Sequence, residues 1–406
     1  MWELIRINKR NSIILLVLMA VCLVGLGAVI GMAINGPDGG MLGLMIATGI
    51  WVILTLISFS SGDQIMLAAS NAVPVTHDVN PQLFNVVEEM SIASGLPMPK
   101  VYIINDPAPN AFATGRNPKS ASVAVTAGLL AKLNRDELQG VVGHEMSHIL
   151  HRDILFVTLA GVMLGSVALL SQVFLRGMMY GGGSRRRYSS GEGKGGGGAM
   201  AILLIIAIVA AILAPIVTQL LYFALSRRRE YLADAGSARL TRYPEGLANA
   251  LEKIANDHAP QLASANKVTA PMFIVNPFKK MGEWNLSDMT STHPPTSERI
   301  RILRNMSQGA SLKDYSDAFV NVTKSKTVMP ASALTKEDIA LREASTEAKE
   351  EQKEKQLRQV GDIMRKVNGF IFLTCACGMT LKIPPNYAAA TVECPRCHTV
   401  HNVNKA

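Results

Sequence analysis

The residues that decide the fold are Asn134-Arg-Asp-Glu-Leu-Gln-Gly-Val-Val-Gly-His144-Glu145-Met-Ser-His148-Ile-Leu-His151-Arg-Asp153. Asn134 belongs to a residue type that caps helices, and acidic side chains follow in the first turn, where the helix dipole favours them. The apolar residues after that turn recur at helical spacing. The stretch therefore predicts a helix on which His144 and His148, four residues apart, project from one face.

Two imidazoles at this spacing can bind one zinc ion, and Glu145 between them can act as a general base. A catalytic zinc usually takes a third protein ligand, and the best candidate is Glu230 in Ser226-Arg-Arg-Arg-Glu-Tyr-Leu-Ala-Asp234. Asp234 follows Glu230 by about one helical turn, so its carboxylate can orient a ligand imidazole. The alternative reading of this run is a charged helix end at a membrane.

Four long apolar blocks surround these motifs. Each lacks charged residues, and each is close to the roughly 20 residues that cross a bilayer as a helix. The blocks are Ile13–Ile34, Met41–Ser58, Ile154–Leu175 and Ala199–Leu225. The last two separate His148 from Glu230, and two crossings return the chain to the same side of the membrane. The expected topology and the expected metal site therefore support each other.

The composition agrees with a membrane protein. Of the 406 residues, 49% are hydrophobic and 17% are charged, against about 25% charged in typical soluble domains. A disordered or collagen-like chain is excluded. The net charge of +9 requires no nucleic-acid partner, because much of the excess flanks the apolar blocks, where anionic headgroups attract it.

The basic amino terminus predicts the orientation. A retained anchor is favoured over a signal peptide, whose apolar core is only about 7–15 residues long. By the positive-inside rule, Arg6, Lys9 and Arg10 place the amino terminus, the active site and the carboxyl-terminal region in the cytoplasm. The basic, glycine-rich connection between the third and fourth blocks, 176–198, fits this orientation badly.

These residues resemble HtpX-type membrane zinc metalloproteases, which are related to the CAAX prenyl endopeptidases. The similarity covers about residues 1–305 and rests on four motifs. They are Asn110-Ala-Phe-Ala-Thr-Gly115, the His144–His148 helix, the Glu230–Asp234 helix and Thr292-His293-Pro-Pro-Thr-Ser-Glu-Arg299-Ile300.

The resemblance implies a gluzincin-like domain in which His144, His148 and Glu230 hold the catalytic zinc and Glu145 is the base. It also implies that Asn110, His293 and Arg299 line the cleft and bind substrate or stabilise the oxyanion. From the residues alone, His293 can equally be a loop histidine and Arg299 a surface helix charge.

One short strand is expected between these motifs, over Ser120–Thr126. In proteases of this type an edge strand pairs with extended substrate backbone, a form of β-augmentation. A purely structural strand is the alternative.

The carboxyl-terminal cysteines predict a second zinc site. Cys22 lies in the first apolar block, whereas the other four cysteines lie in Cys375-Ala-Cys377-Gly378 and Cys394-Pro-Arg-Cys397-His398. Paired thiolates at this spacing suit a structural site, in which His398 can replace one cysteine. Haem attachment at Cys394–His398 leaves the first pair unexplained, and disulfides are disfavoured in a reducing cytoplasm.

Together the observations predict a mainly α membrane protein with a gluzincin-like zinc metalloprotease domain and a small edge sheet, four hydrophobic membrane helices and a small β zinc ribbon. The expected divisions are a membrane hairpin at 1–60, the protease domain at 61–310 interrupted by a second hairpin at 154–225, a charged helical linker at 311–368 and the ribbon at 369–406.

The expected function is zinc-dependent cleavage of misfolded or damaged membrane proteins. The expected cofactors are one catalytic and one structural Zn²⁺, and the expected partners are polypeptide substrates and the lipid bilayer. Two rival functions remain open. One is a CAAX prenyl-protein endopeptidase, and the other is a catalytically silent adaptor that binds partners through the ribbon.

Overall fold

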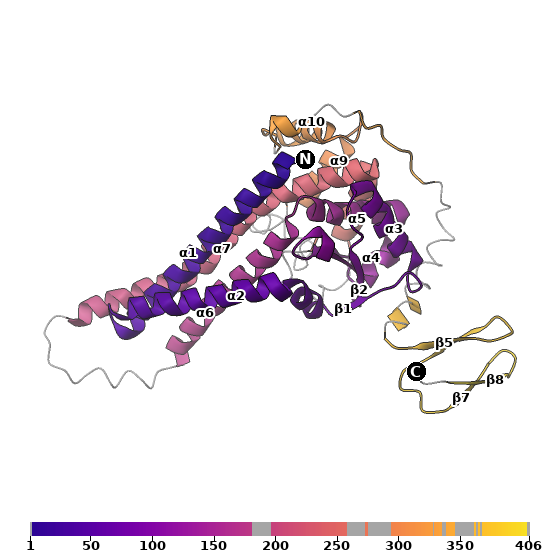
Figure 1. Ribbon diagram of the computed structural model, residues 1–406, viewed down its shortest axis with the longest axis horizontal. Coiled ribbons are helices and arrows are strands. Elements are labelled where there is room, and N and C mark those ends of the chain that lie inside the picture. Colours follow the sequence, from indigo (N-terminus) through magenta and orange to yellow (C-terminus); the bar gives the residue numbers. More distant parts are fainter. Residues whose placement is uncertain are drawn as a thin grey trace.

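The computed structural model describes residues 2–180, 196–257, 273–274, 294–327, 329–334, 338–345, 361–362, 364–365 and 368–403. Long helices project from one side of a mixed helical and β body, and a small β module lies at the opposite end of the molecule (Figure 1). The expected class, a mainly α membrane protein with a small sheet, is confirmed.

Within the described part of the chain, four helices are long and apolar enough to cross a membrane, as the blocks predicted. They are α1 (Trp2–Asn35), α2 (Gly39–Ala69), α6 (Ile154–Tyr180) and α7 (Gly196–Thr241). Their outward faces carry large apolar side chains such as Val21, Ile53 and Val173, each more than half exposed. In water such a surface is costly, but it suits contact with lipid.

Glycines allow α1 and α2 to approach closely. A Cβ on Gly43 would lie 2.2 Å from the carbonyl oxygen of Gly27, and one on Gly31 would lie 2.3 Å from that of Gly39. Membrane helices associate through such small residues, because lipid supplies no hydrophobic driving force between apolar surfaces. The first hairpin is therefore held by backbone-to-backbone packing.

The body contains a four-stranded sheet with the order β1-β2-β4-β3. Its strands are β1 (Ala72–Pro74), β2 (Lys100–Ile104), β3 (Ala111–Thr114) and β4 (Ser122–Thr126). β2 and β4 are parallel, whereas β1 and β3 pair antiparallel to their neighbours. Short helices are α3 (Pro81–Ser94), α4 (Ala127–Lys132) and α8 (Pro244–Ala255). The core between sheet and helices includes Val123, Val142 and Leu251, all fully buried.

The sheet order decides between the two expectations for residues 120–126, an edge strand for substrate and a purely structural strand. β4 lies between β2 and β3 and pairs on both sides, which agrees with the structural strand. An edge strand is excluded here, because an internal strand has no free hydrogen-bonding edge. The outer strands of the sheet are β1 and β3, of which β3 lies in the Asn110–Gly115 motif and packs against the helix with the histidines.

Two further helices of the body lie among the described residues. They are α9 (Thr296–Arg304) and α10 (Leu312–Thr323). Tyr315 and Phe319 of α10 belong to the main core, and the Phe319 ring lies 5.0 Å from that of Tyr231. The packed body therefore continues into the region where a charged linker was expected. Residues 346–360 of that region lie outside the described residues.

The carboxyl-terminal module consists of two hairpins. They are formed by β5 (Ile371–Thr374) with β6 (Thr380–Ile383) and by β7 (Thr391–Glu393) with β8 (Val400–Asn402). Each hairpin turn carries one cysteine pair. Gly378 and His398 adopt φ angles of 83° and 58° just after these pairs, which gives each turn the tight shape that a zinc knuckle needs.

Candidate active site

The site is built on α5 (Arg135–Leu150), the helix that the histidine motif predicted. Its start is a capping box, in which the Asn134 side chain accepts from the Glu137 N–H and the Glu137 carboxylate accepts from the Asn134 N–H, both at 2.9 Å. This arrangement satisfies two amide groups that a helix start would otherwise leave without partners. The helix is then almost entirely buried between the sheet and α7.

Small residues bring α5 and α7 into direct contact. Ser237 on α7 donates to the backbone carbonyl of Gly140 on α5 at 2.6 Å. About two turns further along α5, Ser147 faces Gly236, where a Cβ would lie 2.0 Å from the Ser147 hydroxyl. Two helices can approach so closely only where side chains are minimal. We call these facing residues, Gly140, Gly143, Ser147, Gly236 and Ser237, the α5–α7 seam.

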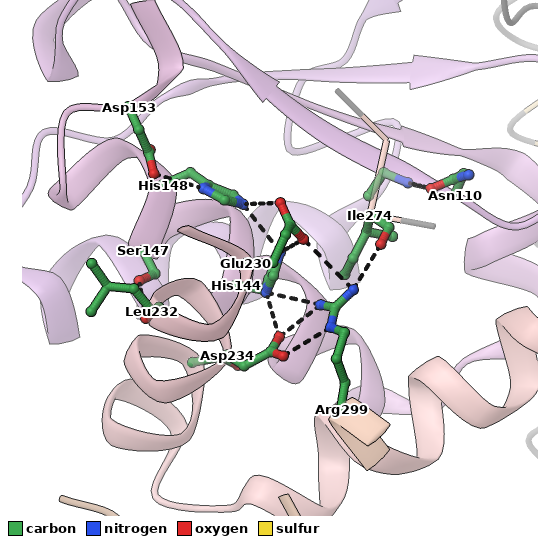
Figure 2. Close-up of polar contacts among 12 residues, drawn as sticks. Asn110, His144, Ser147, His148, Asp153, Glu230, Leu232, Asp234, Ile274 and Arg299 are labelled. Carbon is green, nitrogen blue, oxygen red and sulfur yellow. Dashed lines mark hydrogen bonds and ion pairs between the residues drawn. The ribbon is translucent and has the colours of Figure 1, made fainter. Parts of the chain in front are cut away.

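The seam brings three candidate ligands together (Figure 2). The Nε2 atoms of His144 and His148 are 3.2 Å apart, and they lie 3.5 Å and 3.6 Å from the two carboxylate oxygens of Glu230. All three donor atoms lie within 4.8 Å of one another. Two imidazoles and one carboxylate around a common point form a set that suits a catalytic zinc.

The second nitrogen of each imidazole meets a carboxylate. His144 Nδ1 is 2.9 Å from Asp234, and His148 Nδ1 is 3.2 Å from Asp153. Such contacts fix the ring orientation and leave Nε2 as the ligand atom, so the donor set fits zinc. Sequence reasoning found Asp234 but assigned no role to Asp153, which is 1% exposed. The sequence signal that could have identified Asp153 is a carboxylate five residues after a ligand histidine.

Arg299 binds the carboxylate that contacts His144. Its guanidinium is 0% exposed and donates two hydrogen bonds to Asp234, from Nε at 2.8 Å and from Nη2 at 2.7 Å. Burial alone would raise the pKa of Asp234, but the Arg299 charge and its hydrogen bonds lower it, so Asp234 is ionised. The resemblance implies that Arg299 lines the cleft; its Nη1 lies 3.6 Å from Glu230 Oε2 and its Nη2 lies 3.5 Å from His144 Nδ1, so the guanidinium is in contact with the cluster directly as well as through Asp234.

Glu145 faces β3. Its side chain is 2% exposed and accepts a hydrogen bond from the Ala113 N–H. Burial raises the pKa of Glu145, while the neighbouring histidines oppose this change. A carboxyl group whose pKa lies above its usual range is suited to take up and release a proton near neutral pH.

The outer edge of β3 has further partners within the chain. Ile274 N–H donates to the Ala111 carbonyl at 3.0 Å, and the Ile274 carbonyl accepts from Arg299 Nη1 at 3.0 Å. Beside it, the Phe273 ring packs edge-to-face on Phe112 with 5.3 Å between centroids. The amino-terminal end of the outer edge is thus covered by residues 273–274.

Of the remaining predicted residues, the structure describes Asn110, which lies apart from this cluster. The Asn110 side-chain oxygen accepts from the Ala111 N–H at 3.0 Å, and Figure 2 shows Asn110 away from the three ligands. His151 is buried, its Nδ1 lies 2.8 Å from the Ser147 carbonyl, and burial lowers its pKa to about 4. His293 lies outside the described residues.

Comparisons with known proteins decide the family. Residues 77–307 match the model of peptidase family M48. A protease HtpX homolog of Dictyoglomus thermophilum is 43% identical over 313 residues, which cover 77% of this chain and 97% of the relative. The chain is an HtpX-type member of peptidase family M48. Homologs from Caldanaerobacter subterraneus and Streptococcus agalactiae are 42% and 41% identical, and each match covers 75% of this chain and 98% and 100% of the relative.

A solved structure, that of S. mikatae Ste24p, matches 75% of this chain and 67% of its own at 19% identity and a TM-score of 0.39. The HtpX and M48 membership identifies the chain as a membrane-bound zinc metalloprotease. The HtpX-type prediction is thereby confirmed.

Asp153 offers a test of how the ligands are oriented. Replacing Asp153 with Ala should weaken zinc binding at the histidine site by about 10–100-fold, because His148 loses the partner of its Nδ1. Zinc affinity of the purified full chain is measured by competition with a chelator. Asp317→Ala, which removes an exposed carboxylate paired with Lys313, is the control. Equal affinity of all three proteins would show that Asp153 does not orient His148.

Proposed function

We propose that this M48 protease is an endopeptidase that hydrolyses peptide bonds of misfolded or damaged membrane proteins. One observation carries the proposal: the cluster of His144, His148 and Glu230 lies where α5 leads into the apolar helix α6. Asp153, which contacts His148, is the residue immediately before α6. A polypeptide leaving the bilayer beside α6 would therefore reach the site over a short path.

His144, His148 and Glu230 are proposed as the zinc ligands, because their donor atoms converge on one point. Bound zinc supplies a Lewis acid that polarises the scissile carbonyl and makes water more acidic. Glu145 takes a proton from the attacking water and delivers it to the leaving amine. The raised pKa of Glu145 and its contact with the Ala113 N–H on β3 support this role.

Other residues are proposed to position these groups. Asp234 holds His144, and Arg299 holds Asp234 through its two donors. For Asn110 the described contact favours a role in shaping β3, since its side chain binds the Ala111 N–H. His293 is retained as a proposed oxyanion or substrate ligand on the strength of the family resemblance alone.

We propose that the body and the carboxyl-terminal module face the cytoplasm from the inner membrane. The basic end of α1, with Arg6, Lys9 and Arg10, lies at the body. Asn8 donates to the His151 carbonyl at 3.5 Å, and Arg229 Nη2 donates to the Ser12 hydroxyl at 2.9 Å. These contacts support one shared side for the zinc helix and the positive amino terminus.

A second, structural zinc is proposed in the carboxyl-terminal module. The Sγ atoms of Cys375 and Cys397 are 3.3 Å apart and those of Cys377 and Cys394 are 3.7 Å apart, with all four within 4.8 Å of one another. Four thiolates at the two hairpin turns suit a tetrahedral site. The core of such a small module is not sufficient for stability without a cross-link such as a bound metal ion.

Two alternatives are less well supported. A prenyl-protein endopeptidase is disfavoured, because the alignments with the HtpX relatives span nearly the whole length of each relative at more than 40% identity. A silent adaptor is disfavoured, because Glu145 is buried next to the clustered ligands in a position suited to proton transfer.

The proteolysis test uses Glu145→Gln. Purified wild type with zinc should degrade an unfolded membrane protein, and Glu145→Gln should lose this activity by several orders of magnitude while retaining zinc, since only the proton carrier is removed. Product fragments and zinc content are measured on the same preparations. Equal degradation by both proteins would contradict the mechanism, and selective cleavage of a farnesylated CAAX peptide would favour the prenyl endopeptidase.

Zinc content distinguishes the two sites. The wild type should contain two zinc ions per chain, and the double variant Cys375→Ser/Cys397→Ser should contain one, because two of four thiolates are lost. Cys22→Ser changes the cysteine outside the module and should leave two. Elemental analysis of the purified proteins gives these numbers, and a single zinc in the wild type would exclude the second site.

Protease protection tests the orientation. An epitope added after Ala406 should survive an external protease in intact spheroplasts and be digested in inverted membrane vesicles. A periplasmic domain present in the same cells reports membrane integrity. Digestion of the epitope in intact spheroplasts would place the module outside the cytoplasm.

A further inference from the structure

Residues 338–345 lie beyond the part of the chain that matches the family model, 77–307. Although this segment has no regular secondary structure, its backbone and side chains bind the ends of two helices. We call residues 338–345 the strap. The helices are α5 and α7, which carry His144, His148 and Glu230.

At the start of α5 the strap binds Asp136. Its carboxylate accepts from the Ser345 N–H at 2.8 Å, from the Ser345 hydroxyl at 2.6 Å and from Arg342 Nη2 at 2.8 Å. Asp136 is 8% exposed. Burial alone would raise its pKa, but the hydrogen bonds from Ser345 and Arg342 lower it, so the carboxylate is ionised. Charge-assisted hydrogen bonds of this kind are among the stronger polar contacts in proteins.

At the end of α7 the strap binds carbonyl groups that the helix leaves without partners. Arg342 Nε donates to the Thr241 carbonyl at 2.9 Å, and the Arg342 N–H donates to the Arg242 carbonyl at 2.9 Å. In return, Arg242 Nε donates to the Ala340 carbonyl at 2.9 Å. The positive charge of Arg342 also complements the negative end of the helix dipole.

One guanidinium therefore joins both helices. The Nη2 atom of Arg342 contacts Asp136 and the Gln139 amide oxygen on α5, both at 2.8 Å, while Nε contacts Thr241 on α7. The planar guanidinium fits this bridge, since its donors point in fixed directions. Its carbon also lies 4.9 Å from the centre of the Tyr243 ring.

These contacts lie at one end of the α5–α7 seam. The two helices run antiparallel, so Asp136 and Gln139 on α5 face the end of α7, while His144 and His148 face Glu230 and Asp234 further along. The seam residues are small and offer little side-chain area, and the Ser237–Gly140 hydrogen bond joins the helices between them. Contacts at the helix ends add to this bond in fixing the distance between the helices.

We propose that the strap fixes α5 against α7, and that Arg342 is thereby a positioning residue for the proposed site of His144, His148 and Glu230. This inference rests on the proposed ligand roles. It gives the carboxyl-terminal extension a task in the protease body, because the segment that leads to the cysteine module also holds the two ligand-bearing helices.

The test compares Arg342→Gln with Arg304→Gln in the full chain. Arg304 is a matched control, because its guanidinium contacts Glu245, Asn249 and Glu252 on α8 and does not touch α5 or α7. Both substitutions are made in the Cys375→Ser/Cys397→Ser background, so that the zinc measured belongs to the histidine site. Zinc affinity is obtained by chelator competition, and thermal unfolding is followed in parallel.

Arg342→Gln should weaken zinc binding by about 10-fold, at the lower end of the effects seen for groups that orient ligands, and Arg304→Gln should leave it unchanged. Asp136→Asn should weaken zinc binding to a similar extent, and Arg342→Lys should weaken it less than Arg342→Gln does. In wild-type cysteine background, Arg342→Gln should lower kcat with little change in KM, since the substrate contacts remain.

A lower unfolding temperature with unchanged zinc affinity would overturn the inference, because the strap would then only stabilise the fold. Unchanged behaviour in both measurements would overturn it as well. Should Arg342→Gln fail to fold, Arg342→Lys and Asp136→Asn decide by the same readouts. Failure of the proposed function itself would be visible in the parent protein, as an absence of zinc at the histidine site, before any strap variant is compared.

Discussion

The close approach of α5 and α7 is the constraint on which the rest of the structure depends. Ser237 reaches the Gly140 carbonyl at 2.6 Å, and Gly236 lies directly against Ser147. A larger side chain at these positions would separate the helices and move Glu230 away from the two imidazoles. Sheet, membrane helices and carboxyl-terminal extension all attach to this pair of helices, the extension at the end of the seam that lies away from the ligands.

A chain of buried polar contacts extends outward from the seam. Arg299 binds Asp234, Asp234 binds His144, and Asp153 binds His148. Each group is nearly or fully buried, so each needs its neighbour to satisfy its charge or hydrogen-bonding capacity. The ligand geometry is therefore set by residues on three helices, α5, α7 and α9, and on the connection between α5 and α6. Removing Asp234 would leave the buried Arg299 guanidinium without the acceptor of two of its hydrogen bonds.

Local features explain which parts were predictable from the sequence. The α5 helix, its cap at Asn134 and the apolar blocks follow from spacing and composition within a few turns. The position of β4 inside the sheet and the burial of Arg299 depend on pairing with distant residues, which spacing does not encode. The contacts of the strap could not be predicted from the sequence for a related reason. Its polar side chains resemble a solvated linker, yet they bind helix ends that are far away in the sequence.

The continuous helix α7 has a mechanical consequence. It runs from Gly196 to Thr241 with Pro215 inside it, so the apolar segment and Glu230 belong to one continuous helix. Membrane helices tilt when the hydrocarbon thickness differs from their own apolar length. Because Glu230 lies on the same helix as the apolar segment, a change in the tilt of α7 would displace its carboxylate, and bilayer thickness is therefore expected to act on the proposed zinc site.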